Sequence, residues 1–117
     1  MSFGLNLYSI RNLIANEADF LDTATRLSEM GYSYMQFSGA PFDADMIKRV
    51  SEKSGLPVCL THVPYDRIVH DTAALMEEHS RFGCRYIGLG AMPLDNIKNE
   101  DTFKRHSAKT YVSAAKA

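Results

Sequence analysis

The sequence predicts an α/β fold, namely a parallel (βα)4 sheet with its helices on one face, as in half of a TIM barrel. Strand-like and helix-like periodicities alternate four times along the 117 residues, which we take as one domain spanning residues 1–117. Glycines at positions 31, 55 and 83 stand where three helices should end, so a βα unit repeats every 24 to 28 residues. Successive βα units form a parallel sheet with right-handed crossovers.

The first unit should begin with a strand over residues 4–9, where apolar and polar side chains alternate. Asn16 is expected to cap the helix that follows, and Glu17 and Asp19 place negative charge in its first turn. Apolar residues at helical spacing then lead to Gly31: Phe20, Ala24, Leu27 and Met30.

The later units follow the same plan. Strands are expected over residues 34–38, 57–63 and 85–90. The second helix should begin at Asp43 and end at Gly55, and the third should span residues 69–82. Asn99 is expected to cap a fourth helix that carries Phe103, Thr110, Tyr111 and Ala114.

The two faces of the expected strands differ in character. One face receives apolar residues: Leu5, Leu7, Met35, Phe37, Ile87 and Leu89. The other receives polar, aromatic and glycine residues: Asn6, Tyr8, Tyr34, Gln36, Ser38, Tyr86, Gly88 and Gly90. Such a face favours a barrel interior over a doubly wound sheet, which would have helices on both faces. In the third strand, Val58, Leu60 and His62 share one face, which leaves the doubly wound alternative open.

A barrel of this kind needs eight strands, so we expect the chain to stop before strands 5–8. The open edges of a half-barrel predict a homo-oligomer or a complementary C-terminal half as partner. The 13 Lys and Arg residues against 14 Asp and Glu give no positive field for nucleic acid. No apolar run is long enough for a membrane span, and only two cysteines favour a cytoplasmic location.

Four segments resemble the sugar phosphate isomerase/epimerase family. These xylose-isomerase-like TIM barrels include inosose dehydratases, ketose epimerases and hydroxypyruvate isomerases. Residues 4–11 (GLNLYSIR) resemble the opening strand of that family, and residues 27–32 with 35–39 resemble its second unit. Residues 60–63 (LTHV) resemble its third strand, which ends in histidine, and residues 82–87 resemble the fourth.

The resemblance implies isomerisation, epimerisation or dehydration of a sugar or polyol next to a carbonyl, through an enediolate. It also implies a divalent metal (Mn, Mg or Zn) in the complete barrel. The family's metal ligands and catalytic carboxylates come from the last four strands, so we expect no catalytic residue and no tight metal site here. Gln36 stands where the family usually has Glu, and a neutral amide can bind a hydroxyl but cannot act as a base. The isolated chain should therefore be inactive.

The expected substrate-binding residues lie at the carboxyl ends of strands: His62, Tyr8, Gln36 and Ser38, with Ser9 beside them. His62 could hydrogen-bond a sugar oxygen or move a proton. The alternative is a structural role for these residues. The hydrogen bonds of His62 would then be made by neighbouring backbone groups, and the other polar side chains would bind one another. Asn6 is expected to be structural.

Other residues give weaker signals. His70, His79 and His106 form no metal signature and are expected at the surface or on helix flanks. Cys59 and Cys84 are expected to be small buried hydrophobes. Two further functions stay open, a self-assembling half-barrel without catalysis and a small doubly wound binding domain.

Overall fold

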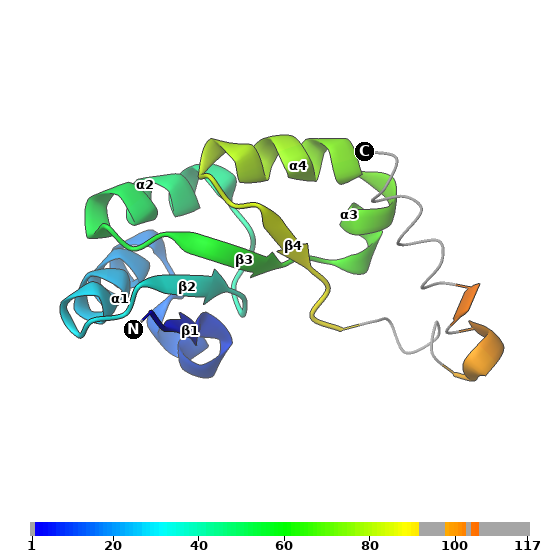
Figure 1. Cartoon of the computed structure of the whole chain (residues 1–117), viewed down its shortest axis with the longest axis horizontal. Helices are drawn as coiled ribbons and strands as arrows, with labels where there is room; N and C mark the ends of the chain where they lie inside the picture. Colours follow the sequence, from blue (N-terminus) through cyan, green and yellow to red (C-terminus); the bar gives the residue numbers. More distant parts are fainter. Residues whose placement is uncertain (1, 92–97, 103, 106–117) are drawn as a thin grey trace.

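The computed structural model describes residues 2–91, 98–102 and 104–105. Its four strands form one all-parallel sheet and follow one another in chain order (Figure 1). The strands are Gly4–Asn6 (β1), Tyr34–Phe37 (β2), Val58–His62 (β3) and Tyr86–Gly88 (β4). This order confirms the (βα)4 prediction. It speaks against a doubly wound sheet, in which the strand order reverses at a switch point.

Helices separate the strands. They are a 3₁₀ helix at Leu7–Leu13 (η1) and α-helices at Glu17–Glu29 (α1), Ala44–Ser54 (α2), Tyr65–His70 (α3) and Thr72–Arg81 (α4). The predicted caps are present, since Asn16 Oδ1 accepts a hydrogen bond from Asp19 N (2.9 Å) and Asp43 Oδ1 accepts one from Met46 N (3.1 Å). Gly55 ends α2 with a left-handed φ of 73°.

Two predicted elements were wrong in extent. The first strand stops at Asn6, because the Asn6 side chain accepts a hydrogen bond from Tyr8 N and starts η1. The third helix begins at Tyr65 and is divided at Asp71, whose φ of −136° is not helical. The sequence pattern missed the end of the first strand because the capping side chain of Asn6 changes the backbone without changing the apolar spacing. The side chain of Asp71 makes no capping hydrogen bond, so the break in the third helix lies in the backbone alone.

The fourth helix falls largely outside the described residues. Asn99 Oδ1 accepts a hydrogen bond from Thr102 N (2.9 Å), which is the expected capping contact. The apolar residues predicted to follow, Phe103, Thr110, Tyr111 and Ala114, lie outside the described part of the chain.

The main core lies between the sheet and the first two α-helices. Met35 and Phe37 of β2 are fully buried there, as predicted, with Val58 of β3 beside them. The helices contribute Phe20, Ala24, Leu27, Ile47 and Val50. Because right-handed crossovers between neighbouring strands place their helices on the same side, the opposite face of the sheet carries no helix layer within the described residues.

An irregularity in β3 decides which of its side chains face the helices. Met35 pairs with Val58, but the next residue, Gln36, pairs with Leu60, so Cys59 is an extra residue on β3. Val58 therefore lies on the helix face, whereas Leu60 and His62 lie on the open face. The prediction that these three side chains share one face was wrong for Val58, since strict alternation cannot anticipate a bulge.

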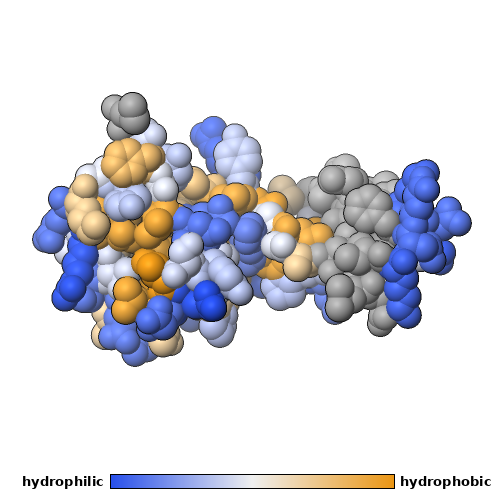
Figure 2. All heavy atoms as spheres, turned by 90° about the horizontal axis from the view of Figure 1, so that it is seen from below, coloured by the Kyte–Doolittle hydropathy of each residue, from blue (hydrophilic) through white to orange (hydrophobic). Residues whose placement is uncertain are grey.

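The open face is partly aromatic and has two free edges. Tyr34 is 37% exposed and Tyr86 is 66% exposed. Among the described strands, β1 pairs only with β2 and β4 only with β3. Figure 2, viewed from below Figure 1, shows apolar side chains reaching the surface in the N-terminal part of the molecule. None of the helices in the described ranges is long and apolar enough to cross a membrane.

Candidate functional site

A hollow of about 420 Å³ lies at the carboxyl edge of the sheet. In a parallel α/β sheet this edge is where ligands bind, because the loops after the strands meet there. The residues around it come from all four βα units: Asn6, Tyr8, Ser38, Gly39, His62, Gly90 and Ala91. Tyr8, Ser38 and His62, which the sequence singled out as substrate contacts, thus lie around one space. Ser9 is exposed and does not line it.

Gln36, the fourth predicted contact, touches His62 and is not part of the wall. Its amide nitrogen Nε2 lies 3.1 Å from His62 Nε2 and 3.5 Å from His62 Nδ1. With the amide nitrogen toward the imidazole, Gln36 donates and a ring nitrogen accepts. A carboxylate at this position would instead accept from the ring, so Gln36 gives His62 a neutral neighbour.

The imidazole of His62 is held on its other side by glycines of the fourth unit. A Cβ added at Gly90 would lie 3.1 Å from His62 Nδ1, and one added at Gly88 would lie 3.0 Å from His62 Cδ2. Larger residues at these positions would push the ring away. His62 therefore sits in a slot formed by Gln36 on β2 and by the glycines.

Asn6 has a larger part in the site than its predicted structural role. Its Oδ1 accepts hydrogen bonds from Ser38 Oγ (2.7 Å) and from Tyr8 N (3.1 Å). One side chain thereby fixes two residues of the hollow, and Asn6 itself lines it. The alternative reading, in which the polar residues hold one another, describes the Asn6–Ser38 and Gln36–His62 contacts well.

Arg11 is a neighbour of the hollow that the sequence analysis did not select. Its guanidinium carbon lies 4.4 Å from the centroid of the Tyr8 ring, and its Nη1 donates to Tyr8 O (2.9 Å). Side chains three residues apart, such as Tyr8 and Arg11, are neighbours on a helix. Because residues 4–9 were predicted to form a strand, the sequence did not indicate this contact.

His79 contradicts the prediction of a surface position. It is only 1% exposed, and its Nδ1 lies 2.7 Å from Leu75 O while its Nε2 lies 2.6 Å from Thr61 Oγ1. The ring also stacks on Phe42, with 4.9 Å between centroids. Burial lowers the pKa of His79, although the hydrogen bond to Leu75 opposes this.

The cysteines are free, with Cys84 buried and Cys59 partly exposed. Burial raises the pKa of the Cys84 thiol, so it is a poor nucleophile and a poor metal ligand. Over the described ranges, no group of three His, Cys, Asp or Glu side chains could hold a metal ion. The hollow offers one imidazole among hydroxyls and amides, which does not fit the divalent metal that the family resemblance implies.

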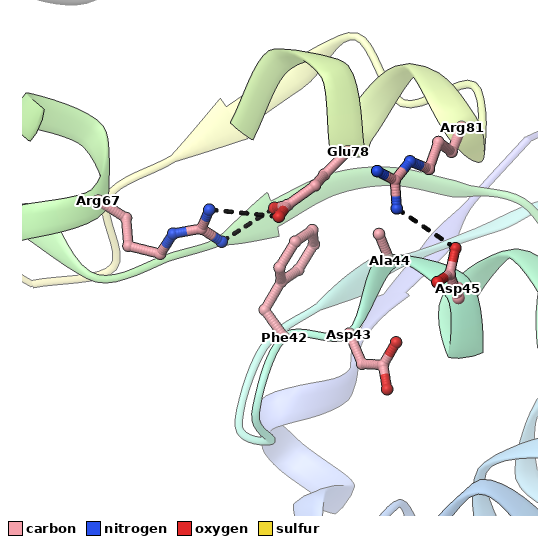
Figure 3. Close-up of a pocket in the computed structure, with 7 residues that line it drawn as sticks. All are labelled: Phe42, Asp43, Ala44, Asp45, Arg67, Glu78 and Arg81. Carbon is pink, nitrogen blue, oxygen red and sulfur yellow. Dashed lines mark hydrogen bonds and ion pairs between the residues drawn. The ribbon is translucent and has the colours of Figure 1, made fainter. Parts of the chain in front are cut away.

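A second hollow of about 270 Å³ lies between α2, α3 and α4 (Figure 3). Its charges pair with one another across helices, because Arg67 Nη1 donates to Glu78 Oε2 (2.9 Å) and Arg81 Nη1 lies 3.4 Å from Asp45 Oδ1. Asp43 is engaged in capping α2. This network joins the three helices, and we assign it no ligand.

Fold and site together describe a parallel (βα)4 half-barrel with a hollow at the carboxyl edge of its sheet. No protein-family model matches the chain, and no curated protein matches it either.

Proposed function

We propose that this chain binds a sugar or polyol at the carboxyl edge of its sheet, as the N-terminal half of an isomerase- or epimerase-like barrel. The observation that supports this most directly is the gathering of Tyr8, Ser38 and His62 around one hollow. The hydroxyl of Tyr8 can donate to and accept from sugar hydroxyls. Ser38 Oγ, which donates to Asn6, can still accept, and the His62 ring, which accepts from Gln36, can still donate. The described side chains of the wall carry no carboxylate, which suits a ligand rich in hydroxyls.

Catalysis in the complete barrel would be proton transfer next to a carbonyl. In this half, His62 is the group that could hold or move a proton. Gln36 cannot serve as a base, and we assign no step to a metal because the residues of the hollow do not fit one. We therefore expect the isolated chain to bind its ligand without turning it over. A cytoplasmic location belongs to the same proposal and is supported by the free thiols of Cys59 and Cys84.

An NMR titration of the ¹⁵N-labelled chain with a panel of sugars and polyols tests this proposal. We expect shifts concentrated at the amides of Ser38, Gly39 and Gly90, and we expect the His62→Ala variant to lose them. His70→Ala is the matched control, because His70 is an exposed histidine at the end of α3. Shifts that survive His62→Ala, or no shifts with any member of the panel, would contradict the proposal.

A second candidate function is self-assembly, favoured by the free edges of β1 and β4. Two copies joined edge to edge would form eight parallel strands, the number that closes a barrel of this type. Tyr86, which is 66% exposed on the open face, would then become buried. Light scattering should give a dimer that Tyr86→Lys disrupts, whereas a wild-type monomer at high concentration would exclude this function.

A further inference from the structure

Arg11 is a positive charge held beside the hollow. Its guanidinium stacks on the ring of Tyr8, and Tyr8 lines the hollow. A Cβ added to Gly39, which also lines the hollow, would lie 2.9 Å from Arg11 Cβ and 3.2 Å from Cδ2 of the Tyr8 ring. Arg11 thus contacts one lining residue and lies close against a second.

The local backbone explains this placement. Ile10 departs from helical geometry inside η1, with φ of −125° and ψ of 31°, so η1 is kinked just before Arg11. The hydrogen bond from Arg11 Nη1 to Tyr8 O (2.9 Å) fixes the side chain over the ring. A guanidinium has five N–H donors, so most of its donors stay available for a ligand.

The charge of Arg11 is also without a counter-ion. The described arginines that form ion pairs are Arg26, Arg49, Arg67 and Arg81. No ion pair joins Arg11 to a carboxylate in the part of the chain that the structure describes. A guanidinium that is positioned by stacking and not neutralised is suited to bind an oxyanion, because its planar donors match phosphate and carboxylate oxygens.

We propose that Arg11 binds an anionic group of the ligand, so that the hollow takes a polyol carrying a phosphate or a carboxylate. This inference rests on the proposed function, which supplies the hydroxyl-binding wall of Tyr8, Ser38 and His62. It adds a charged end to the ligand and places that end beside Tyr8 and Gly39. Since Arg11 is exposed, the attraction should weaken as salt is added.

Three probes of related chemistry separate the possibilities: fructose, fructose 6-phosphate and gluconate. NMR titrations would measure the affinity of each for the wild-type chain and for Arg11→Gln. One charge-assisted contact should favour an anionic probe over fructose by about tenfold in the wild type. Arg11→Gln should remove that preference, so that the anionic probes bind no more tightly than fructose.

Arg85→Gln is the matched control. It removes the same charge from another exposed arginine, which immediately precedes β4 at the amino end of the sheet, away from the hollow. This variant should keep the full preference for the anionic probe. If it loses the preference as Arg11→Gln does, net charge and not Arg11 would be responsible, and the inference would fail.

The remaining outcomes distinguish the inference from the proposed function. A preference for fructose 6-phosphate alone assigns a phosphate, and a preference for gluconate alone assigns a carboxylate. Binding of fructose as tight as that of both anions overturns the role of Arg11 while leaving the proposed function standing. Binding of an anion that is unaffected by His62→Ala would place the anion outside the hollow and contradict both.

Discussion

Thr61→Val tests how much the buried contact between β3 and α4 stabilises the fold. Thr61 is fully buried, and its hydroxyl lies 2.6 Å from Nε2 of the buried His79. Since His79 Nδ1 faces the carbonyl of Leu75, it carries the ring proton and Nε2 accepts the hydrogen bond from Thr61. Valine keeps nearly the shape of threonine but cannot donate.

The expected loss of stability follows from the hydrogen-bond acceptor of His79 that the substitution leaves without a donor. Without the hydroxyl, His79 Nε2 is buried with no partner, which costs about 1–3 kcal/mol. A domain of this size should lose roughly 4 °C in Tm for each kcal/mol. The double variant Thr61→Val/His79→Phe removes both polar partners and retains an aromatic ring against Phe42, so it should recover most of the loss.

The pH dependence gives a second measure of the same contact. Because burial lowers the pKa of His79 below its usual 6.5, the unfolded chain binds more protons than the folded one in that range. The contribution of His79 to stability is therefore complete above about pH 6.5 and is lost as pH falls below it. Of the charged neighbours, Glu78 opposes this shift and Arg67 supports it.

Urea denaturation followed by circular dichroism, from pH 5 to pH 8, measures both effects. The wild type should lose stability on acidification more steeply than His79→Phe, which isolates His79 from the other histidines. The reasoning would be refuted if Thr61→Val unfolded at the same urea concentration as the wild type. It would also be refuted if the double variant were as unstable as the sum of its single changes.

The remaining predictions concern the slot, a helix cap and the bulge. Gly90→Ala should displace the His62 ring and weaken ligand binding about fivefold, which corresponds to the loss of one hydrogen bond of ~1 kcal/mol. In a His62→Ala background, the same substitution should not weaken ligand binding any further. Asp43→Ala should lower the free energy of unfolding by ~1 kcal/mol in urea, because it removes the cap of α2. Deleting Cys59 should leave a folded chain with the same faces, whereas inserting an alanine before Thr61 should unfold it, as far-UV circular dichroism would show.

Much of the fold could be predicted because local chemistry and tertiary structure agree. Asn16 and Asp43 cap helices in the structure for the reason that makes them good caps in any helix. The same holds for Gly55, whose positive φ suits glycine. Polar side chains at the carboxyl ends of strands could likewise be expected to converge, because parallel strands end at one edge.

The parts that could not be predicted depend on contacts between distant residues. Asn6 ends its strand because its side chain serves both Tyr8 and Ser38, and residue 38 comes from the next unit. His79 is buried because Thr61 and Phe42 happen to face it from other elements. Neither the period of a helix nor the composition of a segment carries this information.

Thr61 and His62 are neighbours on β3 but face opposite sides of the sheet, so one contributes to stability and the other to the proposed ligand site. The pleat sends Thr61 toward α4, where it is buried against His79, and sends His62 to the hollow on the open face. The bulge at Cys59 sets this arrangement, because in a regular strand that kept Cys59 the side chains of Val58 and Thr61 would lie on opposite faces of the sheet. Stability and ligand binding should consequently respond to different substitutions one residue apart. A change at Thr61 should affect unfolding while the hollow keeps its ligand, and a change at His62 should do the reverse.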